Sequence, residues 1–277
     1  MQTSLLRQSR PARKLKKLLF MLGGRTQRSR WYAGHRLGQI VEALTQPFVP
    51  ENMPPGFGRW MDERIVEYPW LFSRLPEGPG ALLDAGSVLN HGCIISHPKL
   101  RRKKVTIMTL APEPECHWNK GISYVYGDLR NTVFRDGLFD YVVSISTLEH
   151  VGLDNQRFHS LALEQRTQQS GSYLLAVREL ARVLKPGGLC FISLPYGKRA
   201  VQDWMQLFDQ PMIESVIHEF RPQCSRVTYF HYVGDDGWKL SDAKAAADAR
   251  YFDYQKDVPW EGHPAAAGAV ACLELKR

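Results

Sequence analysis

The clearest pattern of apolar and polar stretches lies in residues 137–195. The run Phe139–Ile145 is apolar and rich in β-formers, and it stops at the polar residues Ser146–His150. A short apolar run bounded by turn residues predicts a strand buried on both faces. Apolar positions at near-helical spacing predict a helix over residues 174–184, and Pro186-Gly187-Gly188 ends it because proline cannot continue a helix. The run Leu189–Leu194 predicts a second strand, so the stretch predicts a βαβ unit and a parallel α/β sheet.

The rest of the chain repeats these two periodicities. Further strands are expected over residues 81–85, 105–110, 122–126, 226–233 and 267–275. Helices are expected over residues 12–22, 31–46, 60–75, 90–97, 201–220 and 243–250. The polar segment 156–172 is longer than a usual connection, and it is either a surface insertion or a lid.

These elements predict three regions. Residues 1–30 form a basic tail with an amphipathic helix, residues 31–78 an N-terminal helical cap, and residues 79–277 an α/β domain. The expected fold class is α/β, with a mostly parallel sheet. An N-terminal helical extension precedes this domain.

Charge is distributed unevenly along the 277 residues. The formal net charge is +8, but residues 1–36 hold ten lysines and arginines and no acid, so the remainder is close to neutral. Leu15, Leu18, Leu19 and Leu22 follow helical spacing among these basic residues. Residues 7–30 are therefore a solvated tail, a peripheral contact with an anionic membrane, or, least favoured, a contact with nucleic acid.

Cysteine usage and hydropathy limit the class of protein. The five cysteines are scattered and include no CxxC motif, which favours a reduced, cytoplasmic chain and gives no metal site. No run of about 18 apolar residues indicates a membrane span. The expected location is the cytoplasm, with the membrane surface as an alternative for the tail.

Polar residues follow two of the predicted strands. Asp84-Ala85-Gly86-Ser87 ends the first strand, and Ser146–His150 ends the strand over residues 139–145. In an open parallel sheet, ligands bind beyond the carboxyl ends of the strands. We expect these two turns to border one binding crevice.

A family resemblance rests on the same stretch. The segments FDYVVSISTLEHV, RELARVLKPGG and FISLP resemble the class I S-adenosylmethionine-dependent methyltransferases, over about residues 81–195. The resemblance implies a methyltransferase with S-adenosylmethionine as cofactor. It also implies a Rossmann-like, seven-stranded, mostly parallel sheet with helices on both faces, whose last two strands form an antiparallel, hairpin-like edge. Mapped onto this sequence, it implies cofactor contacts at Asp84, Gly86, Ser87, Asn90, Thr109, Asp128, Leu129, Ser146 and Thr147.

The sequence departs from the family pattern at two places. The glycine-rich loop of the family has Val88 and Asn90 at its later glycine positions here. The acid expected at the end of the second strand is Thr109, so Glu113 or Glu115 is the alternative carboxylate for the ribose. Asp128 is the expected partner of the adenine amino group, and a simple turn aspartate is its alternative.

The catalytic prediction concerns Glu149 and His150. The ordinary pKa of histidine is about 6.5, which suits a general base for a hydroxyl nucleophile. The alternative is a histidine that anchors its turn by hydrogen bonds. The turn resembles that of quinone-biosynthesis O-methyltransferases, but the first carboxylate of their cation-binding run is missing here.

The predicted function is methyl transfer to a small-molecule or sugar acceptor, and O-methylation is the preferred form. A loose resemblance of ERIVEYPW and LLDAGS to methyltransferases of surface-polysaccharide pathways suggests a glycan acceptor. The alternative is a methyltransferase-like binding or scaffold protein without catalysis, motivated by Val88 and Thr109. A nicotinamide oxidoreductase is disfavoured because no G-x-G-x-x-G follows the first strand.

Overall fold

A computed structural model describes residues 10–23, 29–155, 171–252 and 266–277. The predicted insertion at 156–172 lies almost wholly outside these ranges, as do residues 7–9 and 24–28 of the basic tail. The chain forms two compact units, one of residues 1–75 and 229–270 and the other of residues 76–228 and 271–277. The segment 229–270 thus groups with the N-terminal helices, whereas the sequence placed it in the α/β domain.

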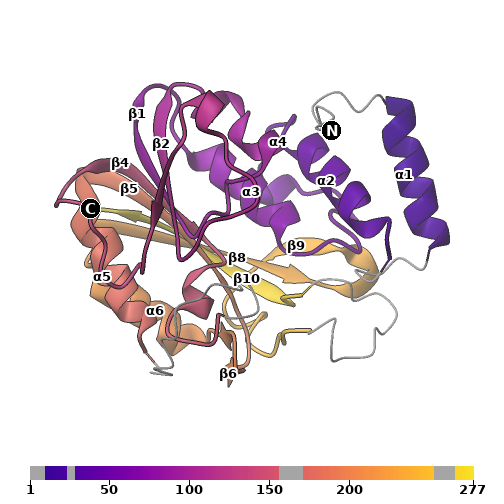
Figure 1. Ribbon diagram of the computed structural model, residues 1–277. Coiled ribbons are helices and arrows are strands. Elements are labelled where there is room, and N and C mark those ends of the chain that lie inside the picture. Colours follow the sequence, from indigo (N-terminus) through magenta and orange to yellow (C-terminus); the bar gives the residue numbers. More distant parts are fainter. Residues whose placement is uncertain (1–9, 24–28, 156–170, 253–265) are drawn as a thin grey trace. The chain divides into compact units, whose positions relative to one another are not determined.

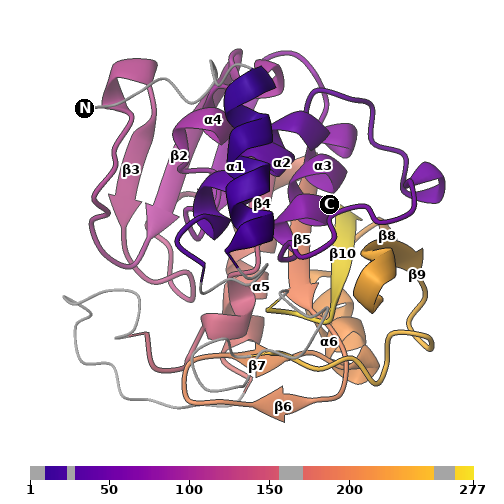
Figure 2. The same cartoon turned by 90° about the vertical axis from the view of Figure 1, so that its right-hand side faces the viewer.

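The α/β unit contains five parallel strands in the order β3-β2-β1-β4-β5; Figure 1 labels β1, β2, β4 and β5, and Figure 2 labels β3. They are β1 (Gly80–Ala85), β2 (Lys103–Thr109), β3 (Ser123–Tyr126), β4 (Phe139–Ile145) and β5 (Leu184–Pro195). Their registers are all parallel, with Asp84 opposite both Ile107 of β2 and Val143 of β4.

The sheet then continues through β10 (Ala269–Lys276), β8 (Cys224–Tyr232) and β9 (Trp238–Ser241), which gives eight strands rather than seven. The predicted antiparallel pairing of the last two expected strands is confirmed, because β10 lies next to β8 and the Gln223 and Tyr232 amides donate to the Lys276 and Gly268 carbonyls. Their predicted position at the edge is wrong, because β10 lies between β5 and β8 and the edge strand is β9. The antiparallel hairpin is formed by β8 and β9, with Tyr229 opposite Ser241.

Apolar runs explain the central strands. Val142, Val143 and Ile145 of β4 are fully buried, as expected for a strand covered on both faces. The LKPGG segment bulges out of the pairing between β4 and β5. Phe139 pairs with Leu184 and Tyr141 pairs with Leu189, so the residues between Leu184 and Leu189 are not in regular register. The predicted turn therefore lies within the β5 bounds instead of preceding the strand.

The helices of this unit are α4 (Gly92–Ile95), α5 (Tyr173–Val183) and α6 (Gln210–Phe220), and α5 packs against α6. The predicted helix 201–220 is too long at its start: β6 (Ala200–Val201) and β7 (Gln206–Leu207) form a small hairpin there. The helix begins only where Asp209 accepts a hydrogen bond from the Met212 amide at 3.0 Å, a normal N-cap. The predicted helix 90–97 is reduced to α4. Short 3-10 turns are η3 (Pro98–Leu100), η4 (Trp118–Lys120) and η5 (Leu148–His150).

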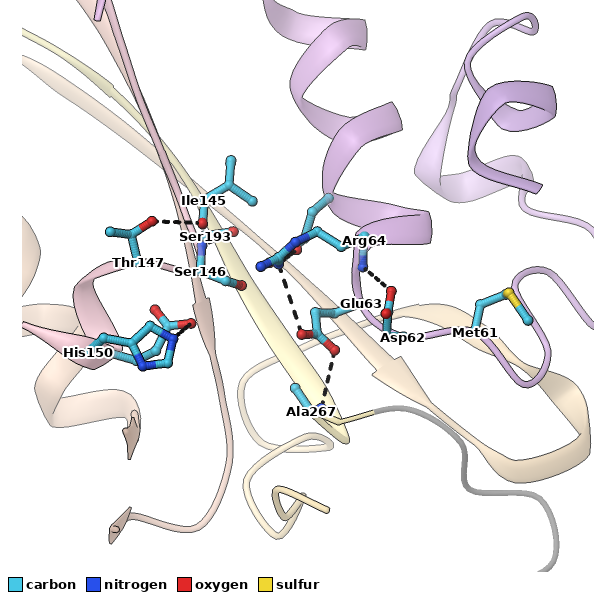
Figure 3. Close-up of polar contacts among 12 residues, drawn as sticks. Met61, Asp62, Glu63, Arg64, Ile145, Ser146, Thr147, His150, Ser193 and Ala267 are labelled. Carbon is cyan, nitrogen blue, oxygen red and sulfur yellow. Dashed lines mark hydrogen bonds and ion pairs between the residues drawn. The ribbon is translucent and has the colours of Figure 1, made fainter. Parts of the chain in front are cut away.

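The other unit holds α1 (Arg10–Leu22), α2 (Tyr32–Ala43) and α3 (Arg64–Arg74), with the 3-10 turns η2 (Pro50–Asn52) and η6 (Gly234–Asp236). Its segments are tied together by buried contacts, such as the Trp238 indole N–H donating to the Met61 carbonyl at 2.9 Å. Figure 3 shows a charged cluster in which Arg64 contacts Glu63, and Glu63 accepts from the Ala267 amide at 3.3 Å. Residues 243–248 form turns and no helix occurs over 243–250, so the helix predicted there is wrong.

None of the helices in the described ranges is long and apolar enough to cross a membrane.

Candidate functional site

The order in which successive strands join the sheet reverses between β1 and β4, although the strands themselves stay parallel. From β1 the chain proceeds to β2 and β3 on one side, and it then returns to place β4 on the other side of β1. Such a switch point opens a crevice at the carboxyl ends of the two strands, where ligands of open α/β sheets bind. The structure brings Gly86, after β1, and Thr147, after β4, to this point, as the sequence predicted for the two turns.

The two turns are in direct contact. A Cβ atom on Gly86 would lie 2.1 Å from Oγ1 and 2.3 Å from Cγ2 of Thr147, and Gly86 has a φ of +117°. Thr147 is itself held by its hydroxyl, which donates to the Ile145 carbonyl at 3.0 Å (Figure 3). Only glycine therefore fits at position 86.

Backbone strain occurs on both sides of this contact. Ser87 has a φ of +66° and Ser146 a φ of +40°, values that residues with a side chain rarely adopt. The Ser146 amide donates to the Ser193 carbonyl at 3.0 Å and to the Ser193 hydroxyl at 3.1 Å, which holds the turn after β4 in place. Strained non-glycine residues gather at ligand clamps and active sites, so their position supports a functional crevice here.

Asp84 organises the loop after β1. It is fully buried, and its Oδ2 accepts from the Leu89 amide at 2.8 Å, which closes the loop over residues 85–89. Burial raises the pKa of Asp84 to about 8; hydrogen bonds from the Leu89 and Val88 amides oppose this rise, and the Glu113 carboxylate adds to it. The carboxyl group is therefore mostly protonated at neutral pH.

Asn90 connects the loops after β1 and β2. Its amide donates to Glu113 Oε2 at 2.7 Å and to the Glu115 carbonyl at 2.9 Å, and its Oδ1 accepts from the Tyr124 hydroxyl at 2.8 Å. The Asn90 side chain is thus engaged within the protein, and it places the Glu113 carboxylate beside the loop after β1. The role of Tyr124 was not predicted, because its partner is 34 residues away along the chain.

The predicted adenine side of the site contains Thr109, Asp128 and Leu129. Thr109 and Leu129 are buried, and the Thr109 carbonyl accepts from the Gly127 amide at 2.9 Å. Asp128 is clamped by Arg130, whose Nε and Nη2 donate to Oδ2 at 2.9 and 2.6 Å. Burial works against ionisation of Asp128, but the hydrogen bonds from Arg130 outweigh it and lower the pKa of Asp128. Arg130 was missed by sequence reasoning, although it stands only two residues beyond the predicted aspartate.

Glu149 and His150 lie in η5, directly after β4. The His150 ring stacks on Trp204, with a centroid distance of 5.3 Å, and its Nδ1 lies 2.8 Å from the Trp204 carbonyl oxygen. On its other side, Nε2 lies 3.8 Å from Glu149 Oε1 (Figure 3). Trp204 is a second missed residue; it is 54 positions from His150, and no sequence pattern links the two.

The predicted cofactor fits the polar atoms at this end of the sheet. Asp84 Oδ1, Ser87 Oγ and Ser144 Oγ are buried side-chain atoms without a hydrogen-bond partner in the described residues. Buried polar atoms left unpaired are costly, so a ligand with several hydrogen-bonding groups is the natural partner. The amino acid, ribose and base portions of S-adenosylmethionine supply such groups. Among the described residues, no cluster of His, Cys, Asp and Glu could hold a metal ion.

Part of the chain is similar to a known protein family. Residues 98–192, from η3 to β5, match the family model described as a methyltransferase domain. No curated protein matches the chain. A solved structure with a similar fold is the 1,6-didemethyltoxoflavin-N1-methyltransferase of Burkholderia thailandensis, with 15% identity, 72% of each chain covered and a TM-score of 0.42. Another is a SAM-dependent methyltransferase of Methanosarcina mazei, with 13% identity over 74% of this chain and 96% of that chain and a TM-score of 0.43.

The family match and the chain's own topology support the same assignment. The matched segment supplies β2 to β5, including the turn of Ser146 and His150, while the loop of Asp84 and Gly86 lies just before it. The cofactor of this family is S-adenosylmethionine. We conclude that residues 98–192 are similar to a methyltransferase domain, in agreement with the family resemblance of the sequence.

Proposed function

We propose that this enzyme methylates a hydroxyl oxygen of a small-molecule or sugar acceptor and that His150 is the general base. The observation that carries this proposal is the contact between His150 Nδ1 and the Trp204 carbonyl oxygen. A carbonyl oxygen can only accept a hydrogen bond, so Nδ1 carries the proton in the neutral ring. The lone pair is then on Nε2, which is the atom that would accept a proton.

The proton-transfer step follows from this arrangement. When bound, S-adenosylmethionine supplies a methyl group already activated on a sulfonium. His150 Nε2 would take the proton of the acceptor hydroxyl as that oxygen is methylated. Glu149 Oε1, 3.8 Å from Nε2, stabilises the imidazolium ion that results. The stack on Trp204 fixes the plane of the ring during this transfer.

The cofactor would be held at the switch point. Its methionine portion fits beside Ser87, Ser146 and Thr147, with the Gly86 backbone in close approach. Glu113, positioned by Asn90, is the carboxylate available to the ribose hydroxyls, because the side chain at the end of β2 is that of Thr109. Asp128, whose pKa Arg130 lowers, would present its carboxylate to the adenine amino group, next to the buried Leu129.

The acceptor class rests on chemistry and on sequence. A neutral histidine base suits a hydroxyl nucleophile, whereas an amine that is already deprotonated needs no such base. The ERIVEYPW segment resembles methyltransferases of surface-polysaccharide pathways, which favours a sugar hydroxyl. We also propose that the enzyme acts in the cytoplasm and meets an acceptor at the membrane surface through residues 7–30.

The first test is calorimetric titration of S-adenosylmethionine into the wild type and into Asp128→Ala. We expect saturable binding to the wild type and much weaker binding to the variant. No binding to the wild type would instead favour the non-catalytic scaffold suggested by Val88 and Thr109.

The second test measures transfer of a labelled methyl group to a panel of sugars and hydroxylated small molecules. With an active acceptor, His150→Asn should abolish most turnover without weakening cofactor binding, while His218→Asn, at an exposed position on α6, should change neither. Full activity of His150→Asn would refute the base. Transfer to amines alone would refute O-methylation.

A further inference from the structure

Within the described part of the chain, the N-terminal helix α1 packs against its unit through the side that carries Phe20. Phe20 is fully buried, and its ring stacks on His35 of α2 at a centroid distance of 4.7 Å and also meets the Tyr32 ring at 6.0 Å. Lys16 lies across α2 on the same side, because a Cβ on Gly34 would be 3.5 Å from its Cδ. This contact orients the helix and determines which side chains face outward.

The outward side of α1 is apolar along its centre. Leu15, Leu18 and Leu22 are exposed to 56%, 55% and 77%, and their i, i+3, i+7 spacing places them in one row. We call these three residues the leucine stripe. Single exposed leucines are ordinary on protein surfaces, but a row of three on one helix marks an interaction surface.

Positive charge accompanies the leucine stripe. Lys14 and Lys17 are exposed and lie one position before Leu15 and Leu18, and α1 contains no acidic residue. Indeed, none occurs anywhere in residues 1–36. The surface therefore combines an apolar centre with an uncompensated basic flank.

This combination selects one partner over the others. Two copies of the stripe would bring four lysines together without an acid on either helix, so self-association is disfavoured. Nucleic acid would contact the lysines and leave the leucines in water. An anionic bilayer satisfies both sets, because acyl chains receive the leucines while lysine stems extend to the headgroups. A 13-residue helix is about 20 Å long, too short to span the hydrocarbon layer, so it would lie along the surface.

We propose that α1 docks on an anionic membrane surface through the leucine stripe, with Lys14 and Lys17 at the headgroups. The surface brings the methyltransferase to acceptors at the bilayer. The proposal concerns α1 alone and stands whether or not the acceptor chemistry above is correct.

Vesicle sedimentation of the full chain tests the proposal. The probes are phosphatidylcholine vesicles and vesicles with about a third phosphatidylglycerol, at about 0.15 M salt. We expect binding to the anionic vesicles only. Leu15→Gln/Leu18→Gln/Leu22→Gln should lower binding at least about a hundredfold, and Lys14→Gln/Lys17→Gln about tenfold. The matched controls are Leu175→Gln on α5, where the leucine is 44% exposed, and Lys104→Gln/Lys244→Gln; both should bind like the wild type.

Other outcomes would overturn the proposal. One such outcome is that the wild type binds neither kind of vesicle. Another is that the leucine replacements leave binding unchanged while the lysine replacements abolish it. A dimer in sedimentation velocity that the leucine replacements dissolve would identify the stripe as a self-association surface instead. Unchanged circular dichroism and melting temperature in each variant show that the fold is intact. Cofactor titration of the same variants separates this result from a failure of the methyltransferase function.

Discussion

Replacing Gly86 with alanine is expected to destabilise the α/β unit through two separable effects. The first is backbone strain, since a φ of +117° costs a residue with a Cβ about 1–3 kcal/mol. The second is overlap with Thr147, whose Oγ1, Cγ2 and Cβ would lie 2.1, 2.3 and 2.7 Å from the new carbon. Overpacking of this kind costs about 1–3 kcal/mol, and moving Thr147 away would also break its bond to the Ile145 carbonyl. The expected loss of unfolding free energy is therefore about 2–6 kcal/mol.

A matched glycine separates the two effects. Gly121 has a φ of +74° and no atom within 4 Å of its would-be Cβ, so Gly121→Ala carries backbone strain alone. Urea unfolding followed by circular dichroism gives the free energies, and Gly86→Ala should lose about 1–3 kcal/mol more than Gly121→Ala.

A double-mutant cycle with Thr147→Gly then isolates the contact. The double variant should recover about 1–3 kcal/mol relative to the sum of the single losses, because glycine removes all three overlapping atoms. Equal losses for the two alanine variants, together with additivity in the cycle, would refute the close approach of the turns after β1 and β4.

Three further predictions concern charge and protons. His150→Asn should lower the turnover rate about 10²–10⁴-fold and leave S-adenosylmethionine affinity unchanged, as measured by steady-state kinetics and calorimetry; weakened cofactor binding would indicate a structural anchor instead. Burial raises the pKa of Asp84 to about 8, so the protonated side chain contributes to the free energy of unfolding. This contribution is complete below the ordinary pKa of an aspartate and is lost as pH rises through about 8. The free energy of unfolding should fall by up to about 1.4 kcal/mol per pH unit in this range. Urea unfolding at several pH values should show that Asp84→Asn lacks this fall. Parallel plots of unfolding free energy against pH for the two proteins would contradict the buried acid. Asp128→Asn should weaken S-adenosylmethionine binding about tenfold or more in calorimetry, because a charge-assisted hydrogen bond is replaced by a neutral one, and unchanged affinity would place the adenine elsewhere.

Much of the fold follows from local pattern. The bounds of β4, Phe139–Ile145, agree with the prediction because a β-rich apolar run between polar turns has few other ways to be buried. The split of residues 201–220 into β6, β7 and α6 was not predicted, although Asp209 and Pro211 mark the true start of the helix. The position of β10 between β5 and β8 has no local signal at all, because strand order depends on pairing between distant segments.

The candidate site divides in the same way. By itself the sequence determined the parallel α/β class, the family resemblance and the two turns at Gly86 and Ser146, because strand polarity and turn residues are local properties. Only the tertiary structure decided that Thr147 closes against Gly86 and that the Trp204 carbonyl orients His150. These contacts join residues 61 and 54 positions apart, and such distances are set by how the whole sheet packs rather than by any periodicity along the chain.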